Sequence, residues 1–485
     1  MIRPPKRIWF WAGLIAALII AIGLWRGNRS TGELPPSWAE PLVERDLETI
    51  SADTLRVLVL RDPLSWEERP QAITGLEFEL LERFARSMMV QLLAIPVTHP
   101  DTMLMDLQRG RGDLIAAQCT DRKGLRDWFA FTDGYAVVRP MLARLRADGS
   151  AAHHDDSSSA HMPHPVMTSS WSPFMAEDYR FKGTPVPVHA AGETPEDVLM
   201  KVVLGTLPGT IVTGAIAAHE SQRFPILEFI PLDGPERDLR FMLRSNSPEL
   251  LKRFNTWLTD EREVEVRRKL VETYTGTIGE SGPLKTRRGI QVHGDSISPY
   301  DSFFRQHAKG LAWDWELLCV MAWKESRFDS TVTSHKGAEG IMQLMPRTSA
   351  KLGLDSAAAM GDHIRVAARY LSRLDTLWMR AVPEREQRLR FVLASYNAGP
   401  GHVIDAQRLA EHLGLDPKKW EGNVERAMLL LAKPRYYMRP EMKNGFCKGS
   451  QVFHYVRDVV ILYHKLKTRP KGRAHANLEQ GTKAD

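Results

Sequence analysis

The sequence predicts a multidomain protein in which one membrane-spanning helix precedes an α/β domain and an almost wholly helical domain. Three observations predict this order. Residues 8–25 form an uncharged apolar run, and strand and helix patterns alternate from Thr54 onward. From about residue 299, apolar residues recur at the three- and four-residue spacing of amphipathic helices. A chain of 485 residues is long enough for two or three such domains.

The N-terminal segment has the pattern of a signal anchor. Basic residues flank the run 8–25, whose 18 residues suit a membrane span and exceed the usual apolar core of a cleaved signal. No small-residue cleavage site follows, and no cysteine lies nearby for lipidation. We expect an uncleaved anchor over residues 1–30, a linker over 31–53, and the bulk of the protein outside the cytoplasm. A cleaved signal is the alternative, because the charge asymmetry across the segment is modest.

The composition is that of a folded, basic protein. Hydrophobic residues make up 43% and charged residues 26%, which is ordinary for globular domains. The net charge of +6 favours anionic surfaces such as membranes. Nucleic acid is the rival partner for a basic chain, but no arginine-rich arm, zinc-finger spacing or RNA-binding signature supports it. We therefore expect a membrane partner and no nucleic acid.

The alternating part of the chain, residues 54–275, predicts an α/β domain. Strand patterns cover 55–60 and 112–117, and helix patterns cover 75–88 and 101–109. Strands that alternate with helices favour a largely parallel sheet.

Two features raise the question of metals and disulfides. The stretch 151–167 contains four histidines and two aspartates, which are zinc-ligand types, but its Ser, Ala and Pro residues favour a surface loop. We predict no metal site and no cofactor. The three cysteines lie far apart and form no metal-type pair. A Cys319–Cys447 bridge is an open alternative in an oxidising compartment, although Cys319 fits a small core residue.

A Gly-, Ser- and Arg-rich connection over 276–298 separates the α/β domain from the helical domain, which covers 299–468 and is followed by a tail over 469–485. Apolar periodicity predicts the helices of this domain. They cover residues 300–309, 314–326, 347–352, 363–378, 384–396, 402–413, 423–431 and 452–466.

Glu325 is the candidate catalytic residue. It lies at the end of an otherwise apolar helix for which Asp314 is a good N-cap. An apolar wall disfavours the charged form of a carboxyl group, which raises its pKa and suits it to general acid catalysis. The plainer alternative is that Glu325 caps or solvates the helix end.

Several motifs follow Glu325 in a fixed order. Glu325-Ser326 is followed by S-x-x-G-A-x-G-x-M-Q from Ser334 to Gln343, and far downstream by A-S-Y-N-A-G over 394–399. Together they resemble the lysozyme-like catalytic domain of lytic murein transglycosylases over residues 299–464. The pattern N-x-G-x-x-H-x-x-D-A from Asn397 is similar to that of the membrane-bound lytic murein transglycosylase F family. That family joins an N-terminal solute-binding-like module to such a domain.

The resemblance implies an activity and its site. It implies a goose-type lysozyme-like domain that cleaves peptidoglycan without water, with Glu325 as general acid and base and 1,6-anhydro sugar ends as products. The motif region offers no second carboxylate with a family role, since Asp329 matches none. The residues that the resemblance implies for substrate binding are Ser334, Met342, Gln343, Tyr396, Asn397 and Tyr455.

The α/β domain is similar to type 3 solute-binding proteins of the amino-acid-binding class, which have two lobes. The resemblance is carried by G-L-E-F-E-L-L-E-R-F-A from Gly75, by L-x-x-G-x-G-D-L-I-A-A from Leu107, by Arg126, by F-T-D-G-Y from Phe131 and by the return segment 238–243. Arg126 matches an arginine that takes a ligand carboxylate, so we expect a regulatory ligand there, with a muropeptide from the wall as the candidate. A surface or salt-bridged Arg126 is the alternative.

The family resemblance places the protein in the envelope of a Gram-negative bacterium, anchored in the membrane with its domains in the periplasm. A cleaved signal would instead imply outer-membrane association. Two other functions stay open. The protein could be a hydrolytic muramidase, or a wall-binding or sensor protein with weak catalysis.

Overall fold

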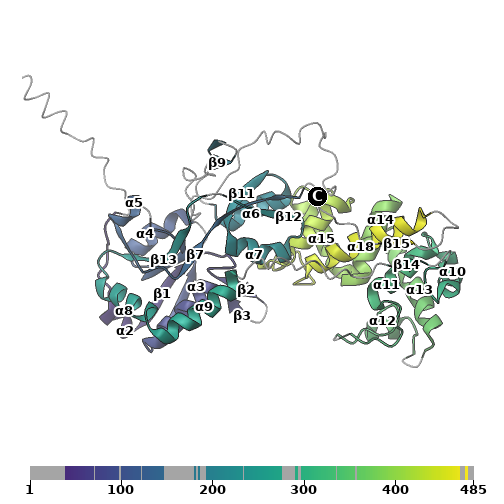
Figure 1. The fold of residues 1–485 in the computed structure, drawn as a ribbon, viewed down its shortest axis with the longest axis horizontal. Coiled ribbons are helices and arrows are strands. Elements are labelled where there is room, and N and C mark those ends of the chain that lie inside the picture. Colours follow the sequence, from purple (N-terminus) through teal and green to yellow (C-terminus); the bar gives the residue numbers. More distant parts are fainter. Residues whose placement is uncertain are drawn as a thin grey trace, which may run out of the picture.

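The computed structural model describes residues 39–69, 72–97, 100–121, 123–146, 180–181, 184–185, 193–232, 234–275, 290–292, 296–334, 336–355, 358–469 and 476–478. The α/β domain and the helical domain lie side by side along the long axis of the molecule (Figure 1). The expected anchor over 8–25 and the histidine-rich stretch 151–167 lie outside the described residues. Within the described ranges, no helix combines the length and apolarity needed to cross a bilayer.

The first lobe is built on a six-stranded sheet. Its path runs β4-β1-β5-β13-β6, with β7 paired to β13. The strands are β1 (Thr54–Val59), β4 (Gln91–Pro96), β5 (Leu114–Cys119), β6 (Phe129–Phe131), β7 (Ala136–Val138) and β13 (Arg237–Arg244). β1 pairs parallel with β4 and β5, whereas β13 runs antiparallel to β5, β6 and β7. The prediction of a largely parallel sheet is therefore correct for β4, β1 and β5 but wrong for the pairings of β13. These are antiparallel because β13 brings the chain back from the second lobe.

The second lobe has a smaller, wholly antiparallel sheet in the order β11-β8-β12. Its strands are β8 (Pro140–Leu145), β11 (Gly209–Thr213) and β12 (Leu227–Pro231), and its helices are α6 (Pro195–Leu204) and α7 (Gly214–Arg223). Thr194 begins α6 with a capping box, and Thr213 caps α7. The chain crosses between the lobes from β7 to β8 and again from β12 to β13.

The described part of the segment expected as a linker packs on the first lobe. It contains α2 (Leu47–Ser51), whose N-cap residue Asp46 accepts a hydrogen bond from the Leu47 N–H. The Asp46 carboxylate also accepts the N–H groups of Glu249 and Leu250, at 3.0 and 2.8 Å, at the start of α8 (Pro248–Leu258). One side chain therefore satisfies two helix N-termini and fixes residues 39–53 against the lobe.

The first lobe carries its other helices around the sheet. They are α3 (Leu76–Ser87), α4 (Met103–Gln108), α5 (Lys123–Arg126) and α9 (Glu261–Thr275), of which α3 and α4 confirm the predicted helices at 75–88 and 101–109. Between β1 and α3, the short hairpin of β2 (Glu67–Arg69) and β3 (Ala72–Thr74) extends from the lobe.

The helical domain confirms the predicted helices in order. Its elements are α10 (Asp301–His307), α11 (Trp315–Ser326), α12 (Pro346–Lys351), α13 (Met360–Trp378), α14 (Arg385–Ala398), α15 (Pro400–His412), α16 (Glu425–Leu430), α17 (Pro434–Tyr437) and α18 (Gly449–Lys467). The sequence did not indicate α17 or the kinked turn Trp420–Val424, in which Glu421 and Gly422 depart from helical backbone angles. α11 is buried along most of its length and packs on α18 (Figure 1).

Two details of this domain differ from expectation. Asp314 has the extended backbone of an N-cap but makes no side-chain cap bond; its carboxylate pairs with Lys467, 2.8 Å away, and with the Tyr463 hydroxyl. The expected connection 276–298 and the tail contribute two short strands that pair antiparallel, β14 (Ile290–Val292) and β15 (Ala476–Leu478). Cys319 and Cys447 are both buried free thiols, so the alternative Cys319–Cys447 bridge is not formed.

Candidate active site

The carboxyl group of Glu325 lies on the last turn of α11, at the end of a helix whose preceding residues are buried core. The Ser326 hydroxyl ties this turn in place by donating to the carbonyls of Ala322 and Ile341, at 3.1 and 2.8 Å. Loss of water around Glu325 raises its pKa to about 7, against the opposite effects of Tyr455 and Lys324. Glu325 is therefore protonated at mildly acidic pH and able to donate a proton.

Two tyrosines from other helices border Glu325. Tyr396 comes from α14 and Tyr455 from α18. Burial, followed by the Glu325 charge, raises the pKa of both phenols. The Tyr455 hydroxyl is buried, and as a hydrogen-bond donor to Glu325 it lowers the pKa of that carboxyl group. The site is thus walled by neutral hydroxyl groups on the side away from α11.

The loop after α11 closes the same site. The Tyr396 hydroxyl donates to the carbonyl of Met342 at 2.8 Å, which joins α14 to this loop. The Met342 side chain is fully buried. The Gln343 amide donates to the carbonyls of Val332 and Gly340, at 2.8 and 2.9 Å, so it braces the loop from within.

Ser334 has a local role in this structure. Its hydroxyl accepts the N–H of Ala338 at 2.9 Å, and its backbone pairs with the same residue at 2.8 Å. Among the described contacts, none joins Ser334 to Glu325. Asn397 follows Tyr396 on the last turn of α14 and is half-buried.

The backbone around the site is strained. Arg327, Phe328 and Gln343 have positive φ values of 59°, 67° and 47°, a region that non-glycine residues seldom adopt. The Arg327 guanidinium stacks 3.5 Å from the ring centroid of Trp323, which helps to hold the turn after Glu325. Strain of this kind, concentrated next to a buried acid, is typical of functional sites.

The expected residues therefore fall into three groups. Glu325, Tyr396, Tyr455 and Met342 are brought together. Ser334, Gln343 and Asn397 lie on the adjoining loop and helix end. Arg126 lies in the other domain, where its side chain is 69% exposed and pairs with Asp121.

Sequence reasoning missed a charged pair beside the acid. Lys324, which directly precedes Glu325, forms an ion pair with Asp458 of α18. Its members are 134 residues apart, so no local pattern could have joined them.

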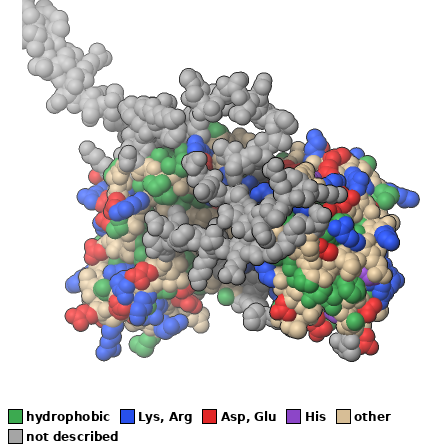
Figure 2. All heavy atoms as spheres, turned by 45° about the vertical axis from the view of Figure 1, so that its right-hand side comes forward, with side chains coloured by type: hydrophobic (Ala, Val, Ile, Leu, Met, Phe, Trp, Pro, Cys, Tyr) green, Lys and Arg blue, Asp and Glu red, His purple; other side chains and the backbone are tan. Residues whose placement is uncertain are grey.

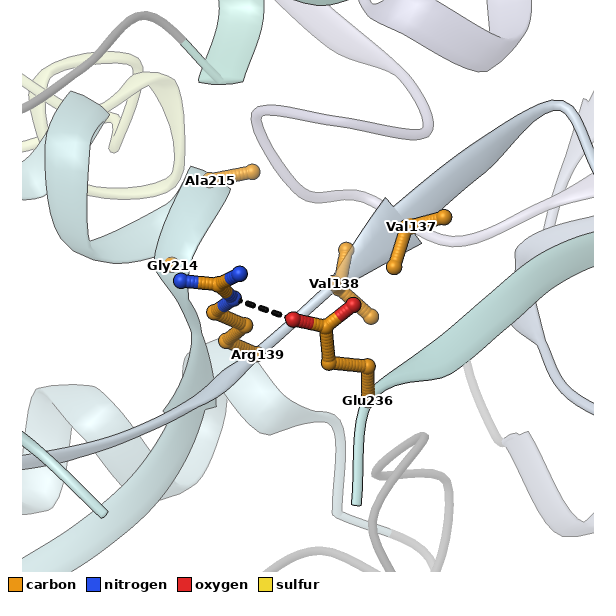
Figure 3. Close-up of a pocket in the computed structure, with 6 residues that line it drawn as sticks. All are labelled: Val137, Val138, Arg139, Gly214, Ala215 and Glu236. Atoms are coloured by element: carbon orange, nitrogen blue, oxygen red, sulfur yellow. Dashed lines mark hydrogen bonds and ion pairs between the residues drawn. The ribbon is translucent and has the colours of Figure 1, made fainter. Parts of the chain in front are cut away.

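A hollow of about 270 Å³ lies at the crossing between the two lobes (Figure 3). It is lined by Val137, Val138, Arg139, Gly214, Ala215 and Glu236. Arg139 donates to Glu236 across it at 2.5 Å. Among the described residues that line the hollow, none is Arg126 and none belongs to the helical domain, so the hollow is separate from the candidate active site.

A buried group of charges joins the two domains. We name Glu67, Glu196, Glu220, Arg223 and Lys433 the junction cluster. Lys433 of the helical domain lies 2.7 Å from Glu220, 3.3 Å from Glu196 and 3.7 Å from Glu67. Arg223 of the second lobe holds Glu67 of the first lobe with two bonds, at 2.5 and 2.8 Å. Both lobes and the helical domain thus meet at one point.

The pKa values within the junction cluster are shifted. Burial opposes ionisation of Glu67, but Arg223 and Lys433 overcome it and hold the pKa of this carboxyl at about 2. Burial raises the pKa of Glu196 to about 7, against the effect of Lys433. Burial also works against the Lys433 charge, yet the carboxylates of Glu196 and Glu220 raise its pKa.

Two protein families match the two domains. Residues 55–277 match the family "Bacterial extracellular solute-binding proteins, family 3", and residues 302–417 match the family "Transglycosylase SLT domain". A crystal structure of the ancestral amino acid-binding protein AncCDT-1 covers 47% of this chain and 98% of its own, with 21% identity and a TM-score of 0.39.

Relatives with the same two-domain order match nearly the whole chain. The membrane-bound lytic murein transglycosylase F of Yersinia pestis (strain Pestoides F) is 27% identical over 98% of this chain and 96% of its own length. That of Shewanella sediminis (strain HAW-EB3) is 25% identical over 86% of each chain. With both domains matched in order along the chain, this protein belongs to the membrane-bound lytic murein transglycosylase F family.

Proposed function

We propose that the protein is a peptidoglycan lytic transglycosylase that cleaves the β-1,4 bond between N-acetylmuramic acid and N-acetylglucosamine without water. The observation that carries the proposal is the Glu325 carboxyl group, which has a pKa of about 7 and lies between Tyr396 and Tyr455. One carboxyl group of this kind can serve both as acid and as base if the substrate supplies the nucleophile.

The reaction has two steps in this proposal. Protonated Glu325 gives its proton to the glycosidic oxygen, the bond to the anomeric carbon breaks, and the N-acetyl carbonyl of the muramic sugar stabilises the cation. The Glu325 carboxylate then takes the proton of the 6-hydroxyl of the same sugar. That oxygen attacks the anomeric carbon and closes a 1,6-anhydro ring, so Glu325 ends protonated and no water is consumed.

The remaining expected residues have supporting roles. Tyr455 stabilises the Glu325 carboxylate between the two steps, because a hydroxyl donor favours the charged form. Tyr396 borders the acid and holds the loop in place through the Met342 carbonyl. Ser334, Met342, Gln343 and Asn397 lie on the segments that would contact the glycan, and backbone at the glycines of this loop can approach it closely.

Mass spectrometry of digested peptidoglycan tests the proposal. We expect 1,6-anhydro-muramic ends and no reducing ends. Reducing ends would instead identify a hydrolytic muramidase, and an undigested polymer from a folded enzyme would favour a wall-binding or sensor protein.

We also propose that the protein is anchored through residues 8–25 in the envelope of a Gram-negative bacterium, with both domains in the periplasm. The support is the length of that apolar run, together with the printed name "membrane-bound" of the relatives. Sequencing the mature chain should find an intact N-terminus. A mature start after Trp25 would replace the anchor with a cleaved signal.

For the α/β domain we propose a role in positioning or regulating the enzyme, and not in transport of free amino acids. Arg126 is paired with Asp121, and the second-lobe segment 209–215 offers no acidic partner for a ligand ammonium group. Calorimetry on the whole protein, with Arg126→Ala as the control, tests this. Tight binding of a free amino acid would refute the role, whereas Arg126-dependent binding of a muropeptide stem would support sensing.

A further inference from the structure

The ion pair of Lys324 with Asp458 lies directly beside the catalytic acid. Lys324 precedes Glu325 on α11, and Asp458 lies one turn beyond Tyr455 on α18. Residues three apart on a helix share a face, so α18 presents the hydroxyl group and the carboxylate toward the same end of α11. The side chains of Lys324 and Asp458 are only 14% and 26% exposed.

The charges around Glu325 are few, which gives this pair its influence. α14 contributes Tyr396, with Tyr370 of α13 behind it at a ring separation of 5.6 Å. Besides Tyr455 and Asp458, α18 contributes His454 and Arg457, and the second lobe contributes Arg146 toward His454. Of these groups, Lys324 is the cation that acts on Glu325. Among the described residues, Asp458 is its one ion-pair partner.

We propose that Asp458 is a positioning residue for the reaction: it fixes the Lys324 ammonium against α18 and neutralises its positive charge beside the Glu325 carboxyl group. The inference rests on the proposed role of Glu325 as acid and base. A neutral pair beside Glu325 leaves the apolar wall of α11 as the dominant influence on the acid.

The physical reason is that a nearby cation would weaken Glu325 in both steps. A free ammonium favours the carboxylate, so fewer molecules would hold the proton needed for the first step. It would also stabilise the carboxylate that must take the sugar proton in the second step. Asp458 limits both effects by fixing and neutralising Lys324.

The test is the pH profile of kcat/KM for glycan cleavage by the full protein. Asp458→Asn should move the alkaline limb to lower pH by roughly half a unit to one unit, because a partly shielded unit charge acts at short range. The double variant Lys324→Met/Asp458→Asn should return the limb to its original position or above it. A change in fold alone would lower activity without this shift and recovery.

A matched control is available in the same domain. Arg390 and Glu421 form an ion pair whose side chains are 17% and 30% exposed, and neither residue lies on α11 or α18. Glu421→Gln should leave the limb in place. The inference would be overturned if the alkaline limb of the pH profile stays in place in folded Asp458→Asn, or if its shift persists in the double variant. Inactivity of Glu325→Gln in the same assay would show that the proposed function still holds. Full activity of Glu325→Gln would instead overturn the proposed function.

Discussion

The Lys433 ammonium lies 2.7 Å from the Glu220 carboxylate, and this buried contact joins the helical domain to the second lobe. The two residues are 213 positions apart in the chain. On the face of the molecule that Figure 2 shows, charged side chains of both signs are mixed over both domains. The junction cluster differs from these surface charges in being withdrawn from water, with Lys433 only 1% exposed.

We predict that Lys433→Met loosens the contact between the domains. Removing one partner of a buried ion pair leaves unpaired charge behind and costs about 3–5 kcal/mol. Amide hydrogen exchange should therefore rise in α6, α7 and α17. The control is Arg435→Gln, which breaks the more exposed pair with Asp197 and should cost about 1 kcal/mol or less. Equal exchange in both variants would contradict a special role for the junction cluster.

Glu325→Gln should abolish glycan cleavage while the fold is retained. The amide has the shape of the acid but cannot donate and recover a proton. Loss of general acid–base catalysis costs roughly a hundred- to ten-thousand-fold in rate, and more when one group serves both steps. Turnover can be measured on purified peptidoglycan, with circular dichroism to confirm folding. Near-normal turnover by the folded variant would rule out Glu325 as the catalytic residue.

Activity should fall as the pH rises through about 7, where Glu325 loses its proton. The sign follows from its raised pKa, which keeps the acid form populated at mildly acidic and near-neutral pH. Above that range, kcat/KM should drop about tenfold for each further pH unit. A rate that stays constant from pH 6 to pH 9 would be incompatible with this assignment.

Gly340→Ala should distort the loop that borders Glu325. Gly340 has a φ of +75°, and an added Cβ would lie 2.6 Å from the Nδ1 atom of His363. Gly353→Ala is the matched control, since Gly353 has a φ of +72° and nothing within 4 Å of the added atom. The control should lose about 1–2 kcal/mol of stability from backbone strain alone.

Gly340→Ala should lose more stability than this control and should also lower kcat, because the loop meets Tyr396 through Met342. Thermal unfolding and cleavage rates measured on both variants separate the two effects. If the two variants lose the same stability and activity, the packing of Gly340 against His363 does not contribute to function.

Much of the fold was predictable because its signals are local. Apolar periodicity predicted α11, α13, α14 and α18, since each helix buries one face or, for α11, nearly all of its length. The direction of β13 was not predictable from its own residues. It depends on the chain having crossed to the second lobe and returned, which is a property of the topology.

The same division applies to the candidate active site. Glu325 could be identified from its own neighbourhood, because an acid at the end of an apolar helix and the motifs after it lie within one short stretch. Asp458 and Lys433 could not, since each depends on a partner 134 or 213 residues away. A charge acquires its effect from what lies within a few ångströms in space, and helix packing, not sequence order, sets that distance.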